Sequence, residues 1–138
     1  MMKVKPSGLI AFILLFLLGL GWQAAAQGQK PDYGKIVGTW SLEVSAGNEY
    51  YYLTLELAVN EGKLGGKLSE QSGMFKDAPL LETAFDGQTL KYSVKIPTPP
   101  DGAERPVKFE MKLVDNKLDG AITIQDLEIT APVTGTKK

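Results

Sequence analysis

A two-residue alternation of apolar and polar side chains, repeated along most of the chain after its N-terminal segment, constrains this sequence more than any other feature. In its most regular run, Leu53, Leu55 and Leu57 share one face of an extended segment, and Thr54 and Glu56 take the other. Such a period is typical of a β-strand with one buried and one solvated face. No stretch of that region keeps a helical period over a useful length. The alternation therefore predicts an all-β domain.

Eight alternating runs are separated mostly by tight turns in which Asn, Asp and Gly reverse the chain. Residues 97–106 contain four prolines, and proline cannot donate a hydrogen bond to a strand ladder. We therefore expect that segment to be an extended surface loop. The strands are expected at about residues 36–44, 50–59, 64–68, 80–85, 90–96, 107–113, 118–124 and 127–133.

Consecutive antiparallel strands with one apolar face form a meander, and closing the meander removes its exposed edges. We therefore predict an eight-stranded antiparallel up-and-down β-barrel over residues 36–138. A barrel of this size is filled by side chains or holds one small ligand. A two-sheet β-sandwich is the alternative, because alternation alone does not distinguish the two folds, but the tight turns favour the barrel.

The N-terminal segment has a different character. Lys3 and Lys5 precede an apolar run over residues 9–20, and alanines occupy residues 24–26. A positive start, a short apolar stretch and small residues at its end are the three parts of a secretory signal peptide. The run is shorter than the roughly 20 residues that span a bilayer. We expect residues 1–26 to be a signal peptide whose removal leaves no membrane span.

Cleavage between Ala26 and Gln27 leaves a flexible lead-in over residues 27–35 and one domain over residues 36–138. The chain has no cysteine, so this domain has no disulfide. An exported protein without disulfides fits a bacterial periplasm or surface better than a small eukaryotic secreted module. We therefore expect an exported bacterial protein, periplasmic or secreted.

The composition excludes several kinds of chemistry. The chain has no cysteine and no histidine, which removes thiolate catalysis, Cys-type zinc sites and Ser-His nucleophiles. Acids such as Glu43 and Glu110 alternate with apolar residues, as a solvated strand face predicts, and form no recognisable catalytic pair. The formal net charge of −1 gives no electrostatic reason to bind nucleic acid. We expect a protein that is not an enzyme and binds no cofactor, metal or nucleic acid.

Several short motifs, taken in order, resemble a known family. Gly38-Thr39-Trp40 opens the first expected strand; Gly-Lys-Leu at 62–64, Asp-Gly-Gln-Thr-Leu at 86–90, Leu-Asp-Gly at 118–120 and Gly-Thr-Lys at 135–137 follow. The series resembles the lipocalin and calycin superfamily, above all the small lipocalin-like domains of bacterial exported proteins. The resemblance covers about residues 36–138 and implies an up-and-down barrel.

The resemblance also implies a structural plug at one end of the barrel. Trp40 matches the plugging tryptophan by position, and Lys137 or Lys138 would supply the basic side chain that lies across its ring. A cation–π contact of this kind contributes about 0.5–1 kcal/mol at an exposed site.

A lipocalin-like barrel implies a small apolar ligand in its interior or at its mouth. Met74 and Phe75 lie in a polar stretch without clear alternation, so they form either a flap over the opening or a short buried strand. The side chains expected to line the ligand are Tyr51, Leu53, Phe85, Tyr92, Phe109 and Met111.

The alternative function is a protein-interaction module. The sequence resembles protease inhibitors from bacteria of the small eight-stranded barrel type, which have this size, compartment and opening tryptophan strand, although they usually carry a disulfide. The interior discriminates between the two functions. An open apolar pocket of roughly a few hundred Å³ favours ligand binding, and a filled interior favours the interaction module.

Overall fold

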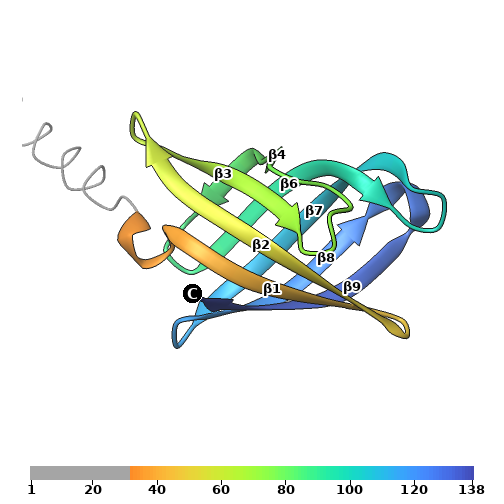
Figure 1. The fold of residues 1–138 in the computed structure, drawn as a ribbon. Helices are drawn as coiled ribbons and strands as arrows, with labels where there is room; N and C mark the ends of the chain where they lie inside the picture. The colour runs from red at the N-terminus through yellow and green to blue at the C-terminus, as the bar shows by residue number, and fades with distance from the viewer. Residues whose placement is uncertain (1–31) are drawn as a thin grey trace, which may run out of the picture. The chain divides into compact units, whose positions relative to one another are not determined.

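Residues 32–138 are described by the computed structural model, in which one antiparallel sheet curls into a nearly closed barrel (Figure 1). Its strands are β1 (Gly38–Ala46), β2 (Glu49–Asn60), β3 (Lys63–Glu70), β4 (Ala78–Pro79), β5 (Leu81–Phe85), β6 (Thr89–Thr98), β7 (Ala103–Val114), β8 (Lys117–Ile124) and β9 (Ile129–Lys137). Two 3₁₀ helices, η1 (Tyr33–Lys35) and η2 (Gln125–Leu127), precede β1 and β9. The sheet runs β4-β3-β2-β1-β9-β8-β7-β6-β5.

The predicted all-β, antiparallel up-and-down barrel is confirmed. All of the strands belong to one continuous sheet, which excludes the sandwich. The described residues form nine strands where eight were expected, because the expected strand at residues 80–85, now β5, is preceded by a separate two-residue strand, β4. The expected signal peptide at residues 1–26, and the lead-in up to residue 31, lie outside the described residues.

β4 and β5 lie at the seam of the barrel. β4 pairs with β3, whereas β5 pairs with β6, so residues 78–85 reach from one edge of the sheet to the other. Between them, Leu80 donates its backbone N–H to the carbonyl of Gly66 at 3.0 Å. The β5–β6 register shifts between Leu81 and Ala84. This segment therefore closes the barrel through two short ladders, one with two residue pairs to β3 and one with three residue pairs to β6.

The expectation of a long proline-rich loop is wrong. β6 continues to Thr98 and β7 begins at Ala103, so only residues 99–102 form the turn. Pro97 lies opposite Glu104, and Pro106 lies two residues along the same ladder. In an antiparallel ladder, hydrogen-bonded and non-hydrogen-bonded pairs alternate. The two prolines lie two positions apart, so both fit the non-hydrogen-bonded pairs, where no N–H is needed.

The inner side of the barrel is filled by side chains. In β6 the alternation is strict, with buried Leu90, Val94 and Ile96 separated by more exposed residues. The largest fully buried side chains are Trp40, Phe109, Ile36, Leu42, Leu55, Leu68, Leu90, Met111, Leu118, Val94, Val107 and Val133. Close packing of this kind leaves little interior space for a ligand.

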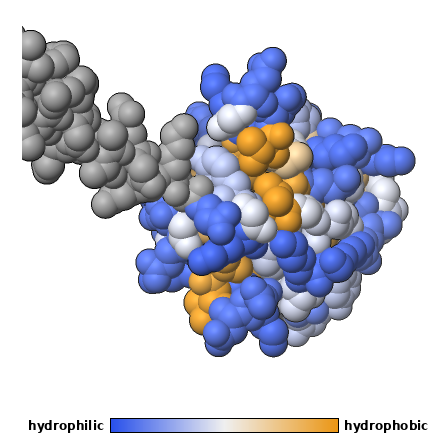
Figure 2. All heavy atoms as spheres, turned by 90° about the vertical axis from the view of Figure 1, so that its left-hand side faces the viewer, coloured by the Kyte–Doolittle hydropathy of each residue, from blue (hydrophilic) through white to orange (hydrophobic). Residues whose placement is uncertain are grey.

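The two ends of the barrel differ (Figure 1). The closed end carries η1 and the turns β2–β3, β5–β6 and β7–β8. The opposite end, called the mouth below, carries the β1–β2 and β6–β7 turns, η2 and the loop of residues 71–77. Figure 2 views the closed end, whose surface is mainly hydrophilic with small hydrophobic patches.

Candidate functional site

An apolar cavity of about 100 Å³ lies at the mouth. Its walls are formed by seven strands, β1–β3 and β6–β9, and by the loop of residues 71–77. Among the lining residues, only Tyr51, Glu70 and Thr98 have a charged or hydroxyl-bearing side chain. The other lining residues are Val44, Ala46, Leu53, Met74, Phe75, Ile96, Pro97, Pro99, Val107, Phe109, Ile122, Ile124, Ile129 and Ala131. The cavity therefore offers contact to an apolar group.

Glu70 fastens the loop that covers one side of the cavity. Its carboxylate accepts hydrogen bonds from the Ser72 hydroxyl and from the Met74 backbone N–H, the latter at 3.0 Å. Its own backbone N–H donates to the carbonyl of Phe75 at 3.0 Å. Partial desolvation raises the pKa of Glu70, but these hydrogen bonds outweigh it and leave that pKa below its ordinary value. The loop is thus tied down by a carboxylate at its base.

The β6–β7 turn on the other side is fastened by an ion pair. Arg105 donates from Nη1 and Nη2 to the two carboxylate oxygens of Asp101, at 2.8 and 3.0 Å. Nη1 also donates to the Thr98 hydroxyl at 2.8 Å, and this hydroxyl donates to the carbonyl of Ala103. The hydrogen bonds from Arg105 hold the pKa of Asp101 far below its usual range. The polar groups of this rim bind one another.

Tyr51 joins the cavity to the rim. Its ring lines the cavity, and its hydroxyl donates to the carboxylate of Glu49 at 2.6 Å. The hydrogen bond to Glu49 is the largest of the causes that raise the pKa of Tyr51. This residue presents an apolar face inward and keeps its polar end at the water boundary.

Five of the eight expected ligand-binding residues meet at this cavity, namely Tyr51, Leu53, Met74, Phe75 and Phe109. Met74 and Phe75 belong to the loop and not to a strand. Met74 is 46% exposed, whereas Phe75 packs against the core.

The other three expected residues, Phe85, Tyr92 and Met111, are buried in the core and do not line the cavity. Phe85 lies towards the closed end, where its ring centroid is 6.5 Å from that of Tyr33 in η1. Alternation identifies which side chains point inward but not how far along the barrel axis they lie. For the same reason, the sequence did not identify lining residues such as Ile96, Ile124 and Ile129, whose positions depend on where the strands begin and end.

At the closed end, the structure brings Trp40 and Lys137 together. Trp40 is fully buried and donates from Nε1 to the carbonyl of Ile36 at 2.8 Å, and Lys137 Nζ lies 5.6 Å from its ring centroid. Gly38 has a φ of +124°, and a Cβ there would lie 3.0 Å from Lys137 Cε. The glycine of the Gly-Thr-Trp motif, which has no side chain, therefore leaves room for the Lys137 side chain to reach the ring of Trp40.

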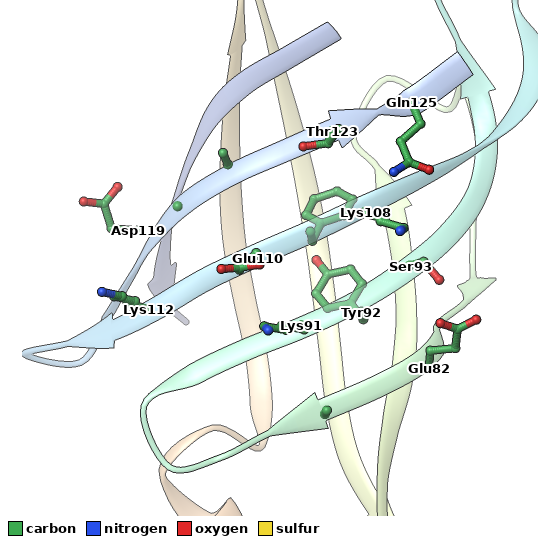
Figure 3. Close-up of a pocket in the computed structure, with 14 residues that line it drawn as sticks. Glu82, Lys91, Tyr92, Ser93, Lys108, Glu110, Lys112, Asp119, Thr123 and Gln125 are labelled. Atoms are coloured by element: carbon green, nitrogen blue, oxygen red, sulfur yellow. The ribbon is translucent and has the colours of Figure 1, made fainter. Parts of the chain in front are cut away.

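A broad hollow of about 710 Å³ on the outer wall of β5–β8 is a second candidate (Figure 3). Three lysines and three acids line it, and the register sets Lys91 opposite Glu110 and Lys112 opposite Asp119. Charges that alternate in this way balance each other on a solvated sheet face. The hollow therefore favours neither an anionic nor a cationic ligand.

Within residues 32–138, no group of His, Cys, Asp and Glu side chains has the geometry to hold a metal ion. No helix in that range is long and apolar enough to cross a membrane.

Comparison with known proteins gives two similar solved structures, both variants of the fluorescent protein UnaG. The first has a TM-score of 0.49 and 17% sequence identity, and the match covers 77% of this chain and 98% of the UnaG chain. The second has a TM-score of 0.47 and 16% identity, and it covers 78% and 99% of the two chains. No family model and no curated protein matches the chain.

Proposed function

We propose that this protein is an exported, non-enzymatic binding protein that takes up a small apolar ligand, or the apolar end of a larger one, at the mouth of its barrel. The observation that carries the proposal is the mouth cavity, whose walls are apolar while the polar groups around it bind one another. Burial of apolar surface is then the main source of affinity there.

The size of the cavity narrows the ligand class. About 100 Å³ is less than the roughly 300–1,000 Å³ of sites that enclose drug-sized molecules. Apolar cavities of about 150 Å³ take up benzene. The inserted group is therefore one ring or a short alkyl end. The remainder of a larger ligand would lie over the rim, against the half-exposed Met74.

A titration with anilinonaphthalene sulfonate, an anionic fluorescent probe whose aromatic rings bind apolar sites, tests this function. Ala46→Phe places a ring in the cavity and should abolish the rise in probe emission. Ala58→Phe is the matched control, because Ala58 is an exposed residue outside the cavity lining and later in the same hairpin. Thermal melts of both variants check their folding. The proposal fails if Ala46→Phe binds the probe as the unaltered protein does.

Export is a separate part of the proposal and rests on the sequence of residues 1–26. Mass spectrometry of the protein produced in a bacterial host should find Gln27 at the N-terminus in the periplasmic or external fraction. Retention of the first 26 residues there would refute this part alone.

The filled interior supports a second candidate function, a protein-interaction module. A cavity of this size also fits one apolar side chain that protrudes from a partner protein, and a barrel-type protease inhibitor is one such module. Absence of probe binding by the unaltered protein would favour this function over the first.

A further inference from the structure

The outer wall of β2, β1 and β9 carries a shallow groove of about 280 Å³, away from the mouth cavity and separate from the proposed function. β1 lies between β2 and β9 along this wall (Figure 1). The polar side chains of the groove come from Ser41, Glu43, Tyr52, Gln71, Thr134 and Thr136. We propose that this groove, extended by Tyr50, binds a neutral saccharide.

The register of the strands assembles the groove. Glu43 lies opposite Tyr52 on one side and opposite Thr134 on the other, so the three side chains form one row across the wall. Ser41 lies opposite Thr136 in the neighbouring row. Tyr50 stands two residues from Tyr52, on the same face and roughly 7 Å along the strand. Two aromatic rings therefore border a strip of hydroxyl groups.

The fold does not require these two tyrosines. Tyr50 is 58% exposed and Tyr52 is 46% exposed, so neither ring contributes much to the core. The neighbouring outward positions of β1 are occupied by Ser41, Glu43 and Ser45, which shows that polar residues without an aromatic ring are sufficient on this wall. Exposed large aromatic residues that lie together are typical of recognition surfaces.

The chemistry of the groove fits a sugar. The face of a tyrosine ring can pack on the C–H face of a pyranose, while hydroxyl, amide and carboxylate groups exchange hydrogen bonds with sugar hydroxyls. The lining contains no lysine or arginine, and within the described residues no ion pair engages Glu43. A free carboxylate with no cation beside it disfavours an anionic ligand.

A protein partner is less well matched to this wall. The centre of a protein interface is apolar and depleted of serine and acidic residues. Here the positions between the aromatic border and β9 hold Ser41 and Glu43. Polar groups that stay hydrated in the free protein need a ligand that offers hydrogen bonds in return, as sugar hydroxyls do.

Native affinity electrophoresis tests the proposal. The purified protein is run in gels that contain hydroxyethyl cellulose, arabinoxylan, laminarin or dextran, and in a gel that contains carboxymethyl cellulose, an anionic polymer. We expect at least one neutral polymer to retard the protein, and carboxymethyl cellulose to retard it less than hydroxyethyl cellulose does if cellulose is the polymer bound. A protein that none of the neutral polymers retards overturns the proposal and leaves a protein partner as the explanation of the tyrosines.

Variants assign the binding to the groove. Tyr52→Ala should weaken retardation by about tenfold or more, as truncation of a central aromatic contact does. Tyr52→Phe keeps the ring and should retain most of the binding, whereas Glu43→Gln should allow carboxymethyl cellulose to bind better. Val114→Ala alters an exposed residue outside the groove and should behave as the unaltered protein. Retardation of Tyr52→Ala and Glu43→Gln equal to that of the unaltered protein would overturn the assignment.

Discussion

The phenol ring of Tyr92 stacks on the phenyl ring of Phe109, with ring centroids 4.7 Å apart and an angle of 15° between the planes. The two residues are directly opposite each other in the β6–β7 ladder. Phe109 lines the mouth cavity, whereas Tyr92 does not. The stacked pair therefore marks the boundary between the cavity and the filled interior.

The hydroxyl of Tyr92 is buried and has no hydrogen-bond partner among the described residues. Burial raises the pKa of Tyr92 well above its ordinary value. We expect Tyr92→Phe to keep the stacked ring and raise the free energy of unfolding by about 1 kcal/mol, because an unsatisfied buried polar group costs about 1–3 kcal/mol. Denaturant unfolding measures the change. A clear loss of stability would instead reveal a partner, such as a buried water.

The plug at the closed end gives a second prediction. Trp40→Ala should lower the free energy of unfolding by about 3–5 kcal/mol, the usual loss for a buried tryptophan. A domain of this size has about 5–15 kcal/mol in total, so the variant should be marginally stable.

The Lys137→Met variant serves as the control for that change. It keeps most of the aliphatic stem but removes the charge 5.6 Å from the ring centroid of Trp40, so its cost should be about 0.5–1 kcal/mol. Thermal and denaturant unfolding compare the two variants. Equal losses for Trp40→Ala and Lys137→Met would contradict the buried plug.

Because the Glu70 carboxylate holds the loop of residues 71–77, we expect the conformation of this loop to depend on pH. Its pKa is lower in the folded protein than the ordinary 4.5, so its stabilising effect is fully present above that value and is lost as the pH falls through the folded pKa. An NMR titration should therefore show the Met74 amide signal shifting with a midpoint below 4.5. In Glu70→Gln that titration should be absent. A midpoint above 4.5 would contradict the hydrogen bonds by which the Glu70 carboxylate holds the loop.

Much of the fold could be predicted from the sequence, because a period of two fixes which face of each strand is buried. The identity of inward residues such as Leu53 and Phe109 followed from that rule alone. Depth along the barrel did not, since it depends on strand ends and stagger, and Phe85 accordingly lies near the closed end and not at the mouth. The paired Pro97 was missed because one proline is tolerated wherever its nitrogen faces no acceptor.

The loop that covers the cavity provides the last prediction. Met74→Ser combined with Phe75→Ser removes two apolar side chains from the cavity wall. Probe binding should weaken about tenfold or more, since that corresponds to about 1.4 kcal/mol, less than the burial of one large apolar side chain. The matched control combines Val59→Ser with Val114→Ser, two exposed apolar residues outside the cavity lining.

Stability should respond much less than binding in the Met74 and Phe75 double variant, because the loop lies outside the strands and Met74 is half-exposed. A thermal melt and a probe titration on the same sample separate the two effects. If the double variant loses several kcal/mol of stability and yet binds the probe with unaltered affinity per folded molecule, the loop supports the core and does not cover a binding site.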